Sequence, residues 1–253
     1  MKFNMSVVPM LLHKNLGLAF KMARGFFKME RTKLMKRHFE NYDHMKNFCL
    51  IYMKLTPLCN LRCVMCGQRG DKGVLKGEFA ANEAKSIVPV ETYKKMIDEL
   101  AEKKPVYYLW GGEPFLYPDL FELVRYIQSK GSFCSINTNG TLLEKYAEQI
   151  VKDKWNVIFF FFFAFKDVND EMRGPGSYDR VIKGFEAINR EKKKQGSNLP
   201  VMGVVTTVTN KNYKSLADLA VACKDLEIDL HMYNLGTYTN DEIFAKHKAY
   251  FKE

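Results

Sequence analysis

The chain has 253 residues, of which 47% are hydrophobic and 27% are charged, and these proportions exclude wholesale disorder. Its longest unbroken apolar run, residues 157–165, is well below the roughly 18 residues needed to cross a bilayer, which excludes an integral membrane protein. The six cysteines are too few for a disulfide-dense secreted scaffold, and residues 1–12 lack the features of a signal peptide. We therefore expect a reducing, cytoplasmic location.

The net charge of +10 is concentrated at the N-terminus, because residues 1–47 hold ten Lys and Arg residues against three acidic ones. Apolar residues at helical spacing, including Leu12, Leu16 and Phe20, predict a basic amphipathic helical extension over this range. Two interpretations remain open. The helix either packs on the rest of the protein or lies on an anionic membrane surface as a peripheral contact. The remaining residues carry only +3, which argues against nucleic acid as a partner.

From residue 48 onward, apolar β-rich runs alternate with segments whose apolar residues recur at helical spacing. The predicted strands are 48–56, 105–111, 132–138, 156–165, 201–209 and 228–234. The predicted helices are 90–103, 119–130, 143–153, 178–194 and 213–226. Strict alternation indicates right-handed crossovers and a parallel sheet. Six such units predict an α/β fold over residues 48–253, a partial (β/α)6 TIM-like barrel, with a doubly wound sheet as the alternative.

Three cysteines, Cys59, Cys63 and Cys66, follow directly on the first predicted strand. In a (β/α) barrel the loops after the strands form the functional face. Three thiolates on one loop can hold three irons of a [4Fe–4S] cube and leave the fourth iron open to external chemistry. A structural zinc site is the alternative, but it usually needs four ligands, and the next histidine after Cys66 is His231. The remaining cysteines are interpreted as core thiols: Cys49, Cys134 and Cys223.

The cysteine loop resembles the CxxxCxxC signature of the radical S-adenosylmethionine (radical SAM) superfamily, and the resemblance extends over about residues 48–235. The resemblance implies a [4Fe–4S] cluster bound by Cys59, Cys63 and Cys66, with S-adenosylmethionine as the second cofactor. It also implies an oxidoreductase or transferase type of enzyme. The reduced cluster would cleave S-adenosylmethionine to a 5′-deoxyadenosyl radical that abstracts hydrogen from a substrate. A low-potential electron donor such as flavodoxin or ferredoxin would supply the electron.

Further motifs match the family and imply cofactor-binding positions. Gly111, Gly112 and Glu113 correspond to its GGE motif at the methionine amino group, a role that suits close backbone approach and a carboxylate. Met65 stands where the family usually has an aromatic residue near the adenine. Five further cofactor-binding candidates have weaker support. Thr138 and Asn139 resemble a family turn but could instead form a helix cap, and Arg173 could bind the cosubstrate carboxylate or cap a turn. Asn210 and Asn234 are candidates for lining the pocket.

One departure from the family concerns the fourth strand. Aligning Arg173 on the family pattern puts Phe161 and Phe163 where a serine and an aspartate commonly stand. Since residues i and i+2 share a strand face, both rings would point at the cosubstrate pocket. That arrangement would weaken S-adenosylmethionine binding or transfer the polar contacts to other groups. In the alternative the strand is offset and all five phenylalanines of 159–163 belong to the core.

The pattern most resembles the subgroup that carries a C-terminal auxiliary-cluster (SPASM) domain and modifies peptides or proteins. No cysteine follows Cys223, so either this domain is lacking or the chain is truncated before it. A peptide or protein is the favoured substrate. Two alternatives remain. One is a non-catalytic iron–sulfur barrel that acts as a scaffold, and the other is an RNA-modifying enzyme, which the charge distribution disfavours.

Overall fold

The computed structural model describes residues 50–71, 73–75, 77–78, 82, 87–162, 164–209 and 211–235. Within them, one sheet contains β1 (Leu50–Lys54), β2 (Val106–Trp110), β3 (Phe133–Thr138), β4 (Val157–Phe161), β5 (Val201–Val208) and β6 (Leu230–Leu235). Each strand lies within its predicted range, except that β6 extends one residue further. Residues 1–47 lie outside the described residues, as do Cys49, Phe163 and Asn210, so the predictions made for them stay predictions.

The helices are α4 (Val90–Leu100), α5 (Leu120–Ser129), α6 (Leu143–Lys152), α7 (Lys166–Arg173), α8 (Ser177–Gln195) and α9 (Leu216–Asp225). All except α7 were predicted. In α5, for example, Leu120, Leu123, Val124 and Ile127 recur at helical spacing, and all four are buried. The helix α7 was missed, because two of its three buried residues, Asn169 and Arg173, are polar, and the strand predicted to precede it was too long, since β4 ends at Phe161.

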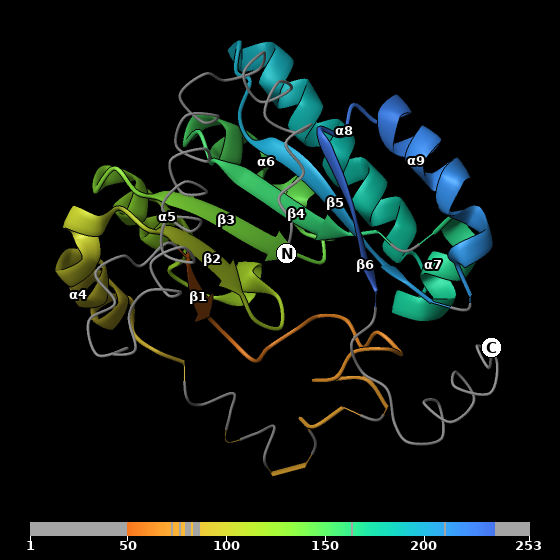
Figure 1. The fold of residues 1–253 in the computed structure, drawn as a ribbon, viewed down its shortest axis with the longest axis horizontal. Coiled ribbons are helices and arrows are strands. Elements are labelled where there is room, and N and C mark those ends of the chain that lie inside the picture. The colour runs from red at the N-terminus through yellow and green to blue at the C-terminus, as the bar shows by residue number, and fades with distance from the viewer. Residues whose placement is uncertain are drawn as a thin grey trace, which may run out of the picture.

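The six strands are all parallel and follow one another in the sheet in chain order. A doubly wound sheet would reverse its strand order at a switch point, so that alternative is wrong and the partial barrel is confirmed. The connecting helices lie along one side of the sheet, and the cysteine segment, coloured orange, runs past the ends to which the strand arrows point (Figure 1). No helix in the described ranges is long and apolar enough to cross a membrane.

The two faces of the sheet have different roles. The outer face packs against the helices, and its core includes Phe160 and Phe162, which contact Phe185 of α8 with ring centroids 4.2 and 6.1 Å away. On β4, Phe159 and Phe161 therefore point to the opposite, inner face, where both are half-buried. The alternative in which the whole phenylalanine run belongs to one core does not hold. Phe161 lies on the inner face, as the family alignment predicts.

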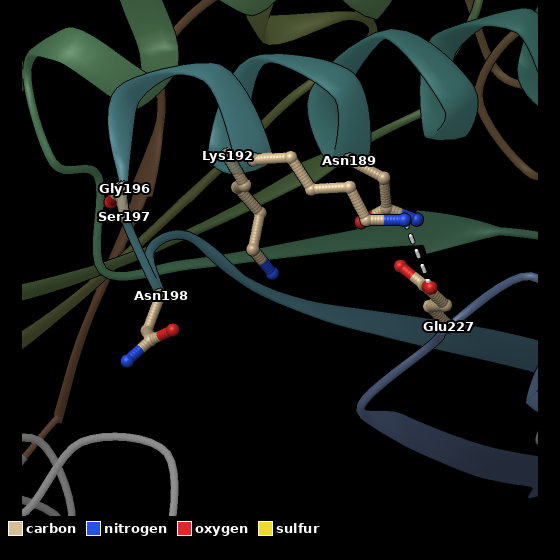
Figure 2. A pocket seen from close by; sticks show the side chains of 7 residues that line it. Asn189, Lys192, Gly196, Ser197, Asn198 and Glu227 are labelled. Atoms are coloured by element: carbon tan, nitrogen blue, oxygen red, sulfur yellow. Dashed lines mark hydrogen bonds and ion pairs between the residues drawn. The ribbon is translucent and has the colours of Figure 1, made fainter.

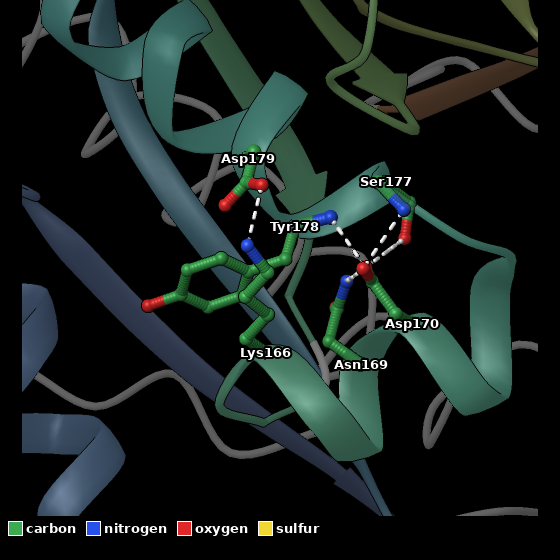
Figure 3. A network of polar contacts seen from close by, with 7 residues as sticks. Lys166, Asn169, Asp170, Ser177, Tyr178 and Asp179 are labelled. Carbon is green, nitrogen blue, oxygen red and sulfur yellow. Dashed lines mark hydrogen bonds and ion pairs between the residues drawn. The ribbon is translucent and has the colours of Figure 1, made fainter.

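The corner between α7 and α8 is organised by a single carboxylate (Figure 3). Asp170 accepts hydrogen bonds from the backbone N–H groups of Gly176 and Tyr178, both at 2.8 Å, and from the Ser177 hydroxyl at 3.0 Å. Burial acts to raise the pKa of Asp170, but these donors together hold it below its ordinary value. Asp170 thus caps the start of α8, where Gly176 offers no capping side chain.

The variant Asp170→Asn is expected to lower the free energy of unfolding by about 1–2 kcal/mol near neutral pH, because an amide matches these donors poorly. The native pKa lies below the unfolded-state value, so the stabilisation is complete above the unfolded pKa and is lost as pH falls through the native one. Urea denaturation along a falling pH series measures this. Asp179→Asn, which breaks only the exposed pair with Lys166, is the control and should change stability little. Equal losses in both variants would contradict the capping role.

Candidate active site

The cysteine loop is anchored where its first residues cross the end of β2. Gly112 N–H donates to the Thr56 carbonyl and Glu113 N–H to the Leu58 carbonyl, both at 2.7 Å. A Cβ atom at Gly111 would lie 2.4 Å from Thr56 O, and one at Gly112 would lie 2.1 Å from Leu58 O. Both positions therefore require glycine, because the backbone that leads into the cysteines passes directly against them.

The variant Gly112→Ala is expected to push the backbone near Leu58 away and to destabilise the fold by about 1–3 kcal/mol. The displaced backbone leads straight into Cys59, so the iron bound per chain after anaerobic reconstitution should fall as well. Denaturation midpoints and iron analysis measure the two effects. A variant with wild-type stability and iron content would show that the close crossing is not needed.

The three thiols of the loop are half-buried and unbridged. Leu61 N–H donates to Cys59 Sγ, and Arg69 N–H donates to Cys66 Sγ, both at 3.4 Å. Burial raises the pKa of the Cys59 and Cys63 thiols. At Cys59 the Leu61 N–H acts in the opposite direction on the pKa and favours the thiolate, which is the form that binds metal.

The spacing of these thiols distinguishes between the two metal interpretations. Among the described residues, no three His, Cys, Asp or Glu side chains stand close enough to hold one metal ion. A zinc site needs its ligands around a single point, about 2.0–2.3 Å from the metal. In an iron–sulfur cube each thiolate binds a different iron, so the sulfurs lie further apart. Three soft ligands on one loop, with N–H groups at two of the sulfurs, suit the cube, and a structural zinc site usually needs a fourth ligand beside them.

Gly70 was not predicted as a site residue, yet the loop folds around it. A Cβ atom there would lie 2.8 Å from the carbonyl oxygens of Cys63, Val64 and Cys66. Its N–H donates to the Cys66 carbonyl at 3.0 Å. The only sequence signal is a glycine shortly after the third cysteine, which alone is weak evidence.

Glu113 is fully buried at the end of β2, and its carboxylate is already occupied by the protein. One oxygen accepts from the Thr138 hydroxyl at 2.7 Å and from Phe115 N–H at 3.1 Å, and the other accepts from Asn139 N–H at 2.7 Å. Burial raises the pKa of Glu113, and these donors oppose the rise. The carboxylate therefore ties the end of β2 to the end of β3.

Asn139 joins this network to the cysteine loop. Its side-chain amide donates to Asn60 Oδ1 at 2.7 Å and lies 3.7 Å from Cys59 Sγ. Its side-chain oxygen accepts from the Thr141 N–H at 2.9 Å, the capping geometry that was the alternative interpretation. The structure thus shows a local side-chain turn at Asn139 rather than a cap of α6, whose first turn has no side-chain cap, and the cosubstrate contact predicted for Thr138 and Asn139 stays a prediction. Asn60 and Thr141, which bond each other at 3.0 Å, were missed, because neither type of side chain is distinctive in a loop.

Arg173, at the end of α7, is only 2% exposed and links the ends of two strands. Its guanidinium donates to the carbonyl of Asn139 at 2.6 Å and to the carbonyl of Phe161, so it joins the ends of β3 and β4. Its positive charge lies near Cys63 and opposes the effect of burial on the pKa of that thiol. Next to it, Val64 N–H donates to the Met172 carbonyl at 2.8 Å. The end of α7 therefore holds the middle of the cysteine loop.

The remaining predicted positions are less closely tied to this network. Met65 is half-buried on the cysteine loop, and Asn234 is exposed near the end of β6, opposite Thr207 of β5. The structure thus brings together the loop, Gly111–Glu113, Thr138, Asn139 and Arg173. For Met65 and Asn234 it gives a position but no contact that supports their predicted roles.

A separate surface cavity of about 480 Å³ lies between the end of α8 and the segments that lead into β5 and β6 (Figure 2). Its lysines already have partners: Lys193 pairs with Glu227 at 3.1 Å, and Lys192 donates to the Pro200 carbonyl at 3.2 Å. It lies at the amino ends of these strands, opposite to the end that carries the cysteine loop. In barrels of this type the amino end serves stability, so we assign it no part in the site.

Residues 53–223 match the model of the radical SAM superfamily. The match covers more than half of the chain and includes the cysteine loop and the ends of β2, β3 and β4. The chain therefore belongs to the radical SAM superfamily, whose members use a [4Fe–4S] cluster and S-adenosylmethionine.

Two curated relatives are each 32% identical to the chain. One is the AdoMet-dependent heme synthase of Methanosarcina barkeri, over 184 residues (70% of this chain, 47% of the relative). The other is the mycofactocin maturase MftC of Mycobacterium ulcerans, over 161 residues (61% of this chain, 40% of the relative). The chain thus spans less than half the length of either relative.

Among solved structures, Streptococcus suis SuiB bound to S-adenosylmethionine has the same fold. The TM-score is 0.63 at 18% identity, over 78% of this chain and 43% of SuiB. SuiB bound to its precursor peptide SuiA superposes with a TM-score of 0.60 at 17% identity, over 92% of this chain and 56% of SuiB. At this level of identity the likeness concerns the fold alone.

Proposed function

We propose that this chain carries a radical SAM active site in which Cys59, Cys63 and Cys66 bind the [4Fe–4S] cluster. When bound, the cluster supplies one electron to S-adenosylmethionine, whose C5′–S bond breaks to leave methionine and a 5′-deoxyadenosyl radical that takes a hydrogen atom from a substrate. The observation that carries the proposal is the joining of the cysteine loop to the ends of β2, β3 and β4 through Gly112, Asn139 and Arg173.

The protein's own residues position these groups. Gly111 and Gly112 let the backbone that leads into the cysteines pass directly against the end of β2, where the family resemblance would put the methionine amino group, and Met65 is the proposed apolar contact for the adenine. Glu113 accepts from Thr138, Phe115 and Asn139, so its carboxylate fixes the ends of β2 and β3 beside the proposed methionine amino group. Asn210 and Asn234 stay candidates for lining the pocket. A low-potential donor such as flavodoxin or ferredoxin would deliver the electron.

We propose a peptide or protein as substrate. SuiB has been solved with a precursor peptide, and MftC is named a maturase. The heme synthase among the relatives makes a tetrapyrrole the competing substrate class.

The experiment is anaerobic reconstitution with iron and sulfide, followed by incubation with S-adenosylmethionine and dithionite. Methionine and 5′-deoxyadenosine should form in equal amounts, and only with the reductant. Absence of the nucleoside from a cluster-loaded sample would overturn the proposed activity.

The half-buried Phe161, in place of the family's serine, favours a second candidate function, a non-catalytic iron–sulfur scaffold. In that case calorimetry with S-adenosylmethionine would give no saturable heat.

Residues 1–47 are proposed to form a basic amphipathic extension that contacts membranes peripherally. Flotation of the full chain with anionic liposomes tests this. The extension is supported as the contact if deleting residues 1–47 abolishes flotation, and the idea fails if flotation is unchanged.

A further inference from the structure

The inner face of the sheet is formed by the strand side chains that point away from the helices. On the described strands these side chains are Leu50, Tyr52, Lys54, Val106, Tyr108, Trp110, Phe133, Ser135, Asn137, Val157, Phe159, Phe161, Val201, Gly203, Val205, Thr207, Leu230, Met232 and Asn234. Lys54 is the only charged residue of this set, and six of the set are aromatic. The inner face is thus an aromatic and nearly uncharged surface.

The lower part of this face is sealed by packing. Phe133, Val157 and Val201 form a buried cluster against which Phe159 and Leu230 pack. Because these residues lie at the amino ends of the strands, they close the barrel at the end away from the cysteine loop. Toward the cysteine loop, the next row of inner-face side chains holds Trp110, Asn137 and Phe159 on β2, β3 and β4.

Aromatic rings line this row and the row below it at fixed positions. Tyr52 and Tyr108, in the register row of Ser135 and Val157, lie side by side on β1 and β2, with ring centroids 5.0 Å apart. A Cβ atom at Gly203 would lie 2.4 Å from two ring carbons of Phe159, so that ring lies across β5 in a space that only glycine leaves free. Two walls of aromatic rings thus stand on either side of β3.

Between these rings, the described strands carry polar groups that have no hydrogen-bond partner among the residues that the structure describes. They are the indole N–H of Trp110, the side-chain oxygen of Asn137 and the Ser135 hydroxyl, and all three atoms are buried. The register pairs Leu109 with Ile136, so the next residues, Trp110 and Asn137, are neighbours on β2 and β3. A buried donor and acceptor left unpaired cost free energy unless a ligand or water completes them.

We propose that this face binds a neutral aromatic group that carries one hydroxyl or N–H, such as a tyrosine or tryptophan side chain of a peptide. The rings supply stacking surfaces, and Trp110 and Asn137 supply one donor and one acceptor. A ring with several carboxylates does not fit, because one lysine on the six strands cannot balance several buried negative charges. This inference rests on the proposed function and narrows its substrate class.

The test measures binding to the cluster-loaded full chain in the presence of S-adenosylmethionine and without reductant, so no turnover is involved. Calorimetry at millimolar concentrations compares four probes: N-acetyl-tyrosinamide, N-acetyl-phenylalaninamide, N-acetyl-leucinamide and coproporphyrin III, which carries four carboxylates. Tyrosinamide should bind tightest, with phenylalaninamide about 5- to 10-fold weaker for the lost hydroxyl, and leucinamide weaker still. Coproporphyrin should give no saturable heat.

A matched pair of variants locates the site. Trp110→Phe keeps a ring and removes the indole N–H, and it should weaken tyrosinamide binding about 5- to 10-fold. Trp155→Phe changes the chain's other tryptophan, which is buried in the core on the helix side, and should leave binding unchanged.

The inference is overturned if leucinamide binds as well as tyrosinamide, if no probe binds, if coproporphyrin binds tightest, or if Trp110→Phe binds tyrosinamide as the wild type does. These outcomes are independent of nucleoside formation. If the chain cleaves S-adenosylmethionine but fails this test, the proposed function stands and only the proposed substrate class is wrong.

Discussion

Replacing Cys59, Cys63 or Cys66 with alanine is expected to reduce the iron and sulfide bound per chain to less than about a tenth of the wild-type amount. Loss of a residue that only supports a ligand already costs about 10- to 100-fold in metal affinity, and these residues are the proposed ligands themselves. Formation of 5′-deoxyadenosine should fall with the iron content. Iron and sulfide analysis and the visible absorbance of reconstituted protein measure the loss.

The matched control is Cys223→Ala. Cys223 is buried in the core against the helices, so its loss should cost about 1 kcal/mol of stability through a small cavity and leave the iron content unchanged. If a single alanine variant of the cysteine loop keeps its full brown colour, the proposed cluster site is wrong. If Cys223→Ala loses iron as well, the loss reflects general unfolding instead.

Most strands and helices could be predicted because their burial follows simple periodicities. The parallel strands are buried enough to appear as apolar runs, and helices such as α5 show one apolar stripe. The helix α7 gave no such signal. Its buried residues are Asn169, Met172 and Arg173, so two of the three side chains that attach it to the protein are polar. A hydrophobic pattern cannot reveal a helix that is held by hydrogen bonds.

Sequence could predict only those residues of the site that belong to a recognisable motif. Three cysteines at this spacing and the Gly–Gly–Glu sequence are distinctive, and the structure places them side by side. The partners of Glu113 and Arg173 were not predictable, because they include backbone groups of β3 and β4 that only the sheet brings together. For Arg173 the sequence favoured a cosubstrate carboxylate or a turn cap; the structure shows its guanidinium donating to two main-chain carbonyls, and the cosubstrate contact stays a prediction.

The variant Arg173→Met should therefore affect the protein before any cosubstrate binds. It leaves the carbonyls of Asn139 and Phe161 without their donor and removes a positive charge near Cys63, so the free energy of unfolding should fall by about 2–4 kcal/mol. Arg173→Lys keeps the charge without the two-pronged donor and should lose less. Urea midpoints at constant m-value, together with the rate at which a chelator removes iron, measure the change. Arg173→Met could instead keep wild-type stability and iron retention while calorimetry shows weaker S-adenosylmethionine binding. In that case the guanidinium binds the cosubstrate carboxylate, and its role of joining the ends of β3 and β4 is wrong.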